Sequence, residues 1–198
     1  MGRTDYADRT ILALRTKYEV EQTEDQSAET EIGVGIQKLS LRRESLFEGK
    51  CSILLPETMT DMGDAERTVI YRNLKRPQII KTDREAGVAM TFSLLPVDDM
   101  PESISMQLDR VSCDMKRIWK QNVFYDKGEI QAEGVSVAWM DYRAFCLDSS
   151  LYCLLFMFLM EEQIVLGNFH CSFPQYDIWK PTVLKLLATL QVHAELNI

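Results

Sequence analysis

The stretch LYCLLFMFLM, Leu151–Met160, is apolar at every one of its ten positions. Successive side chains of a β-strand point to opposite faces of the sheet, so a strand with this sequence has no polar face. Such a strand must be covered on both sides, because neither set of side chains is suited to water. The stretch therefore predicts the central strand of a sheet that lies between two layers.

The segments on either side predict strands that pair with this one, at Val135–Asp148 and Ile164–Phe173. Only two residues, Ser149-Ser150, precede the central strand, and three residues, Glu161 to Gln163, follow it. Connections this short join antiparallel neighbours, since a parallel return needs a crossover of roughly a dozen residues or more. We therefore expect a three-stranded antiparallel meander.

Two helices are expected, one before and one after the meander, at Pro101–Lys120 and Asp177–Leu190. In each, apolar residues recur every three or four positions, which is typical of a helix with one buried face. Asp99 is a plausible N-cap of the first helix. The expected buried faces consist of Ile104, Leu108, Val111, Met115, Ile118 and Trp119 in the first helix, and of Ile178, Val183, Leu184, Leu186, Leu187 and Leu190 in the second.

The N-terminal third divides into an acidic arm and further strands. Residues 19–31 contain six acidic side chains and little that could be buried, so residues 1–32 are expected to form a partly disordered arm. Residues 33–198 are expected to form a single domain. Its first strands are predicted at Val34–Leu41, Leu46–Leu55, Thr68–Tyr71, Gln78–Thr82 and Val88–Leu95.

Composition narrows the classes of function. A net charge of −8 argues against a general nucleic-acid surface, which needs clustered Lys and Arg. The longest apolar run has ten residues, about half of what a membrane-spanning helix requires, so no stable membrane insertion is expected. Five cysteines without a CxxC pair favour reduced thiols in a chain of this size. We expect a cytoplasmic protein that needs no cofactor.

Polar residues interrupt the strand VSVAWMDYRAF and mark a candidate partner-binding surface at Trp139, Asp141 and Arg143. These residues are two positions apart, so they share one face of the sheet with Phe145. They are the candidate residues for contact with another protein. The alternative is an ion pair between Asp141 and Arg143 at the rim of the sheet, which is common on protein surfaces and contributes little.

Cys146, Cys153 and His170 form the one set with catalytic or metal-binding potential. A two-residue turn at Ser149-Ser150 would place Cys146 opposite Cys153, and the next hairpin would place His170 on the same face. The set could serve a small Cys/His hydrolase or a metal-dependent enzyme. Against this, no fourth ligand is evident and buried thiols are usually core residues, so we expect no metal site.

The order of elements, together with two local patterns, resembles the PsbP-like α/β/α sandwich, particularly its DcrB-related branch. The first pattern is the strand ending in "LP" within CSILLPE, Cys51–Glu57. The second is GNFHCSF, Gly167–Phe173, followed by a helix whose first turn carries Trp179. This fold hosts binding proteins, including chaperones for secreted effectors, a nuclear-import regulator and a photosystem subunit.

The resemblance implies an α+β fold, with a mostly antiparallel sheet sandwiched between helices. It also implies a function, because the known members are mostly non-enzymatic. We therefore expect a non-catalytic protein-binding module, acting as a chaperone or adaptor for a secreted or assembled partner. The partner is another protein whose identity the sequence leaves open, and a homodimer also remains open.

Overall fold

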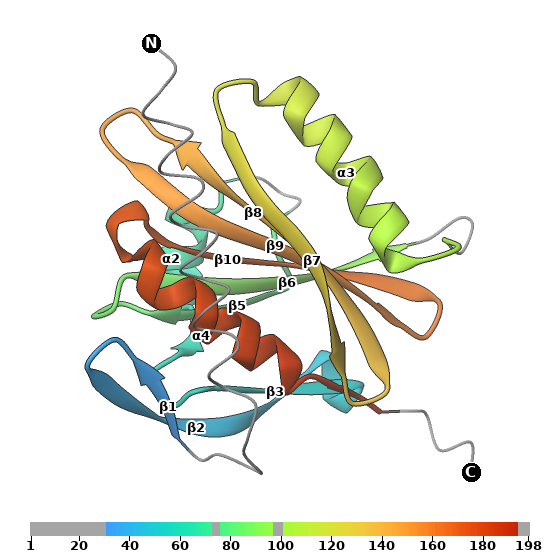
Figure 1. The fold of residues 1–198 in the computed structure, drawn as a ribbon. Coiled ribbons are helices and arrows are strands. Elements are labelled where there is room, and N and C mark those ends of the chain that lie inside the picture. Colours follow the sequence, from blue (N-terminus) through green and yellow to red (C-terminus); the bar gives the residue numbers. More distant parts are fainter. Residues whose placement is uncertain (1–30, 73–75, 97–100, 194–198) are drawn as a thin grey trace.

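A computed structural model describes residues 31–72, 76–96 and 101–193 (Figure 1). The expected acidic arm lies outside the described residues except for Glu31 and Ile32, which belong to the first strand. Asp99, the expected helix cap, also lies outside them.

The strands of the described residues form two sheets. The larger sheet has seven strands in the order β4-β5-β6-β10-β9-β8-β7, which are β4 (Thr60–Asp61), β5 (Ile79–Asp83), β6 (Val88–Pro96), β10 (Gln163–Ser172), β9 (Ser150–Met160), β8 (Val135–Phe145) and β7 (Val123–Ala132). The smaller sheet has four strands in the order β1-β2-β3-β11, which are β1 (Glu31–Val34), β2 (Gln37–Leu46), β3 (Cys51–Pro56) and β11 (Gln191–Val192). All strand pairs in both sheets are antiparallel.

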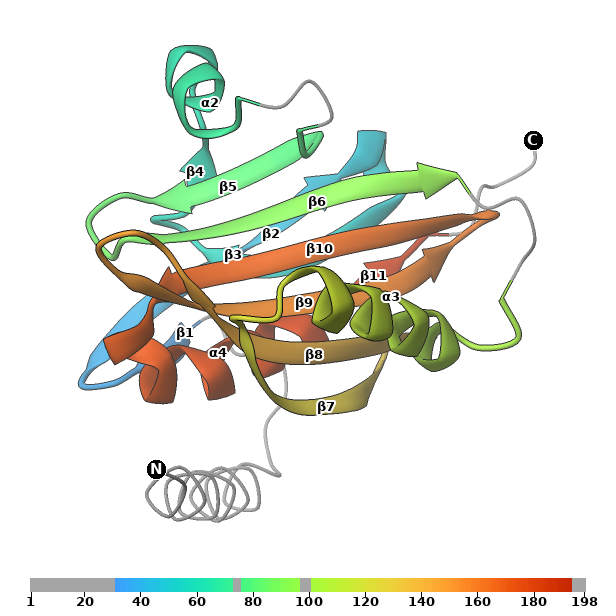
Figure 2. The same cartoon turned by 90° about the horizontal axis from the view of Figure 1, so that it is seen from above.

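Helices and the smaller sheet cover the two faces of the seven-stranded sheet (Figure 2). Helix α3 (Ile104–Ile118) packs on one face, against β7, β8 and β9. Helix α4 (Tyr176–Ala188) and the smaller sheet cover the other face. The remaining helical segments are α2 (Asp64–Ile70), η1 (Phe47–Gly49) and η2 (Phe173–Gln175). The predicted α+β class is confirmed, with a second sheet added to the layer that contains α4.

The central strand behaves as its sequence predicts. β9 lies between β8 and β10, and its side chains are buried on both faces from Tyr152 to Phe158. One set of side chains packs with α4 and the smaller sheet: Tyr152, Leu154, Phe156, Phe158 and Met160. Leu155 and Met157 pack under α3 instead. The sheet is therefore an interior layer of the molecule.

Gly167 on β10 makes room for one of these rings. It pairs directly with Phe156, and a Cβ built at Gly167 would lie only 2.0 Å from an atom of the Phe156 ring. The glycine is thus required by the close approach of an aromatic ring to the backbone.

The hairpin between β8 and β9 has a different register from the predicted one. The chain leaves β8 at Phe145, and the loop is closed by the Cys146 N–H, which donates to the Ser149 carbonyl at 2.9 Å. Tyr142, rather than Cys146, pairs with Cys153. A two-residue hairpin turn favours residues such as Gly or Asn that tolerate positive φ, and the two serines do not provide one.

Other boundaries also differ from the sequence predictions. The predicted strand Thr68–Tyr71 is wrong: it falls on the end of α2, where the Thr68 hydroxyl donates to the Asp64 carbonyl within the helix. The first predicted hairpin is shifted, so that β2 and β3 flank η1, and strand β7 was not predicted at all. Both long helices are confirmed within three residues of their predicted ends, and Ser103 caps α3 by accepting the Met106 N–H.

Candidate functional site

The three predicted partner-binding residues lie on the face of β8 that turns toward α4. Trp139 is partly buried against the main core, and Asp141 is completely buried. Arg143 lies over the Phe173 ring at 4.0 Å and over the Phe145 ring at 4.7 Å, and its Nε donates to Ser150 Oγ. The shared face is confirmed, but Asp141 is not available to a partner. Its ionic partner is Lys180 rather than Arg143.

Lys180 of α4 and Asp141 form the centre of a buried ionic cluster. The Lys180 Nζ lies 2.7 Å from Asp141 Oδ2 and 2.6 Å from Asp126 Oδ2, while the Lys180 side chain is only 1% exposed. Asp141 also accepts the Asp126 N–H and the Tyr152 hydroxyl, at 2.7 and 3.1 Å. An irregularity in the β7–β8 pairing between Phe124 and Lys127 brings Asp126 into this position.

The electrostatics of the cluster favour structural anchoring. Burial raises the pKa of Asp141, although the Lys180 charge and the hydrogen bonds to it act in the opposite direction. Burial would lower the pKa of Lys180, but Asp141 and Asp126 outweigh this effect and raise it. Lys180 is therefore held as an ammonium, which is an ion-pair partner and a poor nucleophile.

The structure bears out one part of the predicted Cys/His set. Cys153 and His170 are paired on adjacent strands and so share one face, as predicted, but Cys146 is exposed in the β8–β9 loop and does not pair with Cys153. Burial raises the pKa of Cys153 to about 11 and lowers the pKa of His170. Within the described residues, no group of three or more His, Cys, Asp or Glu side chains is arranged to hold a metal ion.

Four large apolar side chains form an exposed group that we call the apolar end: Ile36, Phe145, Leu147 and Ile178. The described residues contain five other large apolar side chains with comparable exposure, namely Val69, Ile70, Met106, Ile118 and Trp119. Ile36 and Leu147 are fully exposed at the tips of two hairpins, β1–β2 and β8–β9. Large apolar side chains that gather in one exposed region mark interaction surfaces.

Several contacts bring the loops of the apolar end together. A Cβ on Gly35 would lie 3.6 Å from the Ile178 side chain, so the β1–β2 tip meets the start of α4. Arg143 lies over the rings of both Phe145 and Phe173, which ties the β8–β9 hairpin to η2, directly before α4. Figures 1 and 2 show the two hairpin tips and the start of α4 at the same end of the molecule.

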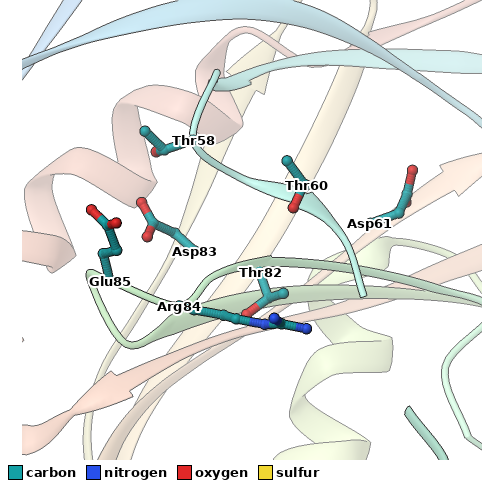
Figure 3. A pocket seen from close by; sticks show the side chains of 7 residues that line it. All are labelled: Thr58, Thr60, Asp61, Thr82, Asp83, Arg84 and Glu85. Atoms are coloured by element: carbon teal, nitrogen blue, oxygen red, sulfur yellow. The ribbon is translucent and has the colours of Figure 1, made fainter. Parts of the chain in front are cut away.

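A polar pocket lies between β4, with the loop before it, and the end of β5 with the β5–β6 turn (Figure 3). Its volume is about 430 Å³, and it is lined by Thr58, Thr60, Asp61, Thr82, Asp83, Arg84 and Glu85. Gln175 of η2 donates to the Ala86 carbonyl, which ties this turn to the start of α4. The pocket therefore adjoins the apolar end and adds hydroxyl and carboxylate groups next to it.

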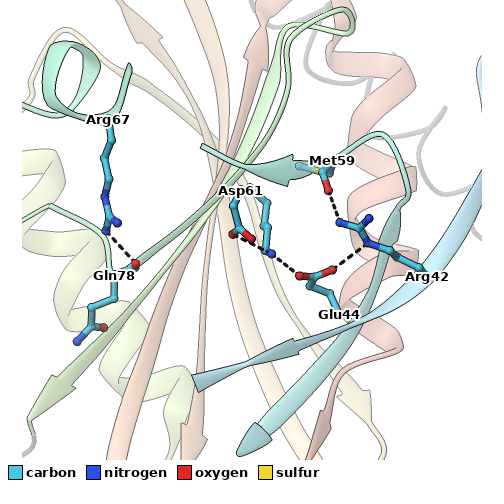
Figure 4. Close-up of polar contacts among 7 residues, drawn as sticks. Arg42, Glu44, Met59, Asp61, Arg67 and Gln78 are labelled. Carbon is cyan, nitrogen blue, oxygen red and sulfur yellow. Dashed lines mark hydrogen bonds and ion pairs between the residues drawn. The ribbon is translucent and has the colours of Figure 1, made fainter. Parts of the chain in front are cut away.

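A second ionic network lies beside this pocket (Figure 4). Lys81, whose side chain is 4% exposed, bonds Glu44 of β2 and lies 2.8 Å from Asp61 of β4. Arg42 contacts the same Glu44 at 2.9 Å and donates to the Met59 carbonyl at 3.0 Å. The network links the smaller sheet to the edge of the larger sheet.

Sequence reasoning missed Lys180, Asp126, Lys81 and Glu44. The available signal for Lys180 was a lysine within an otherwise apolar helical stripe, between Trp179 and Val183. Nothing in the sequence pairs it with Asp141, which lies 39 positions earlier. The exposure of Ile118, Trp119 and Ile178 was also missed, because helical periodicity assigned all three residues to the core.

No protein-family profile matches the chain, and no curated protein sequence matches it. Among solved structures, cyanobacterial PsbP (CyanoP) from Synechocystis sp. PCC 6803 has a TM-score of 0.58 at 13% identity. That alignment covers 85% of this chain and 98% of CyanoP. The Saccharomyces cerevisiae Ran-binding protein Mog1p has a TM-score of 0.52 at 10% identity, covering 78% of this chain and 96% of Mog1p.

These likenesses decide the fold. The chain has the Mog1p/PsbP-like fold. The predicted resemblance to the PsbP-like sandwich is thereby confirmed at the level of the fold. As for membranes, none of the helices among residues 31–72, 76–96 and 101–193 is long and apolar enough to span one.

Proposed function

We propose that this protein is a non-catalytic protein-binding module that binds its partner through the apolar end. The observation that carries the proposal is the grouping of four exposed large apolar side chains at two hairpins and one helix start from different parts of the chain. Mog1p, which has the same fold, is a Ran-binding protein, so the fold is compatible with binding another protein. The role we infer is that of a chaperone or adaptor for a secreted or assembled partner.

The composition of the apolar end suits a protein partner. Aromatic residues and arginine are enriched at the centres of protein interfaces, and Phe145 and Arg143 lie here. Arg143 stacks on the Phe145 ring, so this cation is held in place rather than free to move. The polar pocket next to the apolar end supplies hydrogen-bond acceptors that suit the rim of an interface.

Two finer assignments belong to the same proposal. We place the protein in the cytoplasm, which agrees with its five free cysteines, of which three are buried. We also place it in the DcrB-related branch of the fold, on the sequence patterns at Cys51–Glu57 and Gly167–Phe173. We do not propose a Cys/His enzyme, because Cys153 is a buried thiol of raised pKa and, within the described residues, Cys146, Cys153 and His170 do not form a group that could hold a metal ion.

The test is a comparison of tagged variants in lysate from the native host. Leu147→Asp and Ile36→Asp each place a charge at the apolar end, and both positions are fully exposed, so folding is expected to be unaffected. Each variant should lose a stoichiometric partner that the unaltered protein captures. Met106→Asp is the matched control, since Met106 is also exposed but lies at the start of α3, which packs on the opposite face of the larger sheet from α4.

The proposal is overturned if both apolar-end variants retain the partner at wild-type stoichiometry. It is also overturned if the control loses the partner to the same extent, because the loss would then reflect surface charge in general. Circular dichroism and thermal unfolding of all three variants show whether the fold is retained.

A further inference from the structure

Strand β7 forms one edge of the seven-stranded sheet, and it is a long edge. It has ten residues, whereas β4 at the opposite edge has two. Figure 2 shows β7 as the last strand of the sheet, with α3 and α4 on its two sides. A long edge strand is a template for a further strand, because its outer backbone groups have no ladder partner.

The register identifies which backbone groups point outward. Ala132 and Val135 flank the two-residue turn of the β7–β8 hairpin, so they form a hydrogen-bonded pair. Hydrogen-bonded and non-bonded pairs alternate along an antiparallel ladder. Lys127, Glu129 and Gln131 therefore direct their N–H and C=O groups away from β8. No backbone partner for these groups is present in the described part of the chain.

The side chains of the same residues are complementary to a second copy of themselves. Lys127 and Glu129 are exposed and lie two positions apart on one face of β7. If a second β7 lies antiparallel with Gly128 on the two-fold axis, Lys127 of each copy faces Glu129 of the other. A shift by two residues would place Glu129 opposite Glu129, which is repulsive.

We propose that two copies of the chain form a homodimer by antiparallel pairing of their β7 edges around Gly128. The irregularity between Phe124 and Lys127 ends the straight part of the strand, which confines the new ladder to a short segment. A Cβ built on Gly128 would lie only 3.0 Å from the Trp139 ring, and the glycine has no side chain that would obstruct the approach of the second strand. The dimer extends the sheet across both copies and leaves the apolar end of each copy free.

Existing contacts hold the two charged side chains over the same face. Lys127 Nζ lies 2.6 Å from Asp109 Oδ1 of α3, and Glu129 accepts hydrogen bonds from Ser105 and Ser136. These contacts leave the Lys127 side chain 62% exposed, so it remains accessible to a second carboxylate. The cross-strand pairs are thus oriented before association.

The experiment uses two opposite charge reversals in the full chain, Lys127→Glu and Glu129→Lys. Each variant alone places two like-charged pairs across the axis, so its self-association should be weaker by about tenfold or more. An equimolar mixture of the two variants should recover association as a heterodimer, because both pairs become attractive again. Sedimentation velocity over a concentration series at low salt measures this, with Lys38→Glu on β2 as a charge-reversal control.

Two outcomes overturn the proposal. The first is an unaltered protein that remains monomeric at all concentrations, which would mean that another segment or another protein occupies the edge. The second is a mixture of the variants that associates no better than each variant alone. Glu129→Pro provides an independent check, because it removes an outward N–H while keeping the hydrogen bonds to β8, and it should abolish the dimer. Leu147→Asp should leave the dimer intact, so failure of this proposal is distinguishable from failure of the proposed function.

Discussion

Among the residues that the structure describes, two lysines are buried, and their carboxylate partners differ in exposure. Lys180 and its partner Asp141 are both buried, with 1% and 0% of their side chains exposed. Lys81 is similarly buried, but its partners Glu44 and Asp61 are 18% and 76% exposed. The difference matters when the lysine is removed, because the burial of the carboxylate decides whether an unpaired negative charge remains in the interior. A half-exposed carboxylate can turn to water, whereas a buried one cannot.

The two ion pairs also join different layers. Lys180 connects α4 to Asp141 of β8 and Asp126 of β7. Lys81 connects the larger sheet to Glu44 of the smaller one. Because Ile178 lies two positions before Lys180, the buried pair fixes the part of α4 that belongs to the apolar end. Loss of this pair should therefore weaken partner binding as well as stability.

The largest expected effect is that of Lys180→Met. The substitution leaves Asp141 buried without a counter-charge, so the free energy of unfolding at pH 7 should fall by about 3 to 5 kcal/mol. Burial already raises the pKa of Asp141, and removal of the lysine raises it further. A carboxyl with a raised folded-state pKa favours folding below its unfolded pKa and loses this contribution as the pH rises. Urea unfolding from pH 4 to pH 7 should show a deficit that grows with pH.

A double variant separates the lone charge from the loss of the pair itself. In Asp141→Leu/Lys180→Met both charges are absent, and the free energy of unfolding should return to within about 2 kcal/mol of the unaltered protein. The remaining difference is expected because the Tyr152 hydroxyl loses its acceptor. If the double variant is as unstable as Lys180→Met, then packing of the lysine stem, rather than the unpaired carboxylate, explains the loss.

Lys81→Met should have a smaller effect, of about 1 to 2 kcal/mol, because Glu44 keeps its contact with Arg42 and Asp61 faces water. The same urea titration at pH 7 measures it. Equal losses of unfolding free energy for Lys81→Met and Lys180→Met would contradict the comparison, since they would mean that the exposure of the partner carboxylates does not matter.

The sequence predicts the parts of this fold whose signal is local. β9 was identified because ten consecutive apolar residues leave no polar face, and α3 and α4 were identified from a period of three to four residues. The register of the β8–β9 hairpin was not predictable from strand patterns, since it depends on the conformation of the loop after Phe145. Strand β7 was missed because Asp126 and Lys127 interrupt any alternating pattern within it.

The candidate site was predicted less well, for two physical reasons. First, periodicity identifies the apolar face of a helix but does not show where along the helix the sheet stops covering that face. Ile118 and Ile178 were therefore assigned to the core, although the structure exposes them. Second, an ion pair between distant residues leaves no trace in sequence spacing. Arg143 was the nearby cation for Asp141, but Lys180 is the one that reaches it.

The smallest expected effect is that of Asp61→Asn. This substitution tests directly whether the burial of the carboxylate, rather than its distance from the lysine, sets the stability loss. Asp61 contacts Lys81 at 2.8 Å, a separation close to that between Asp141 and Lys180. Distance alone would therefore predict similar losses for Asp61→Asn and Asp141→Asn. Because the Asp61 side chain is 76% exposed, we expect its loss to be about 0 to 1 kcal/mol and to shrink further at high salt. Urea unfolding of both variants at low and high salt decides between the two accounts, and equal losses would show that separation rather than burial governs these pairs.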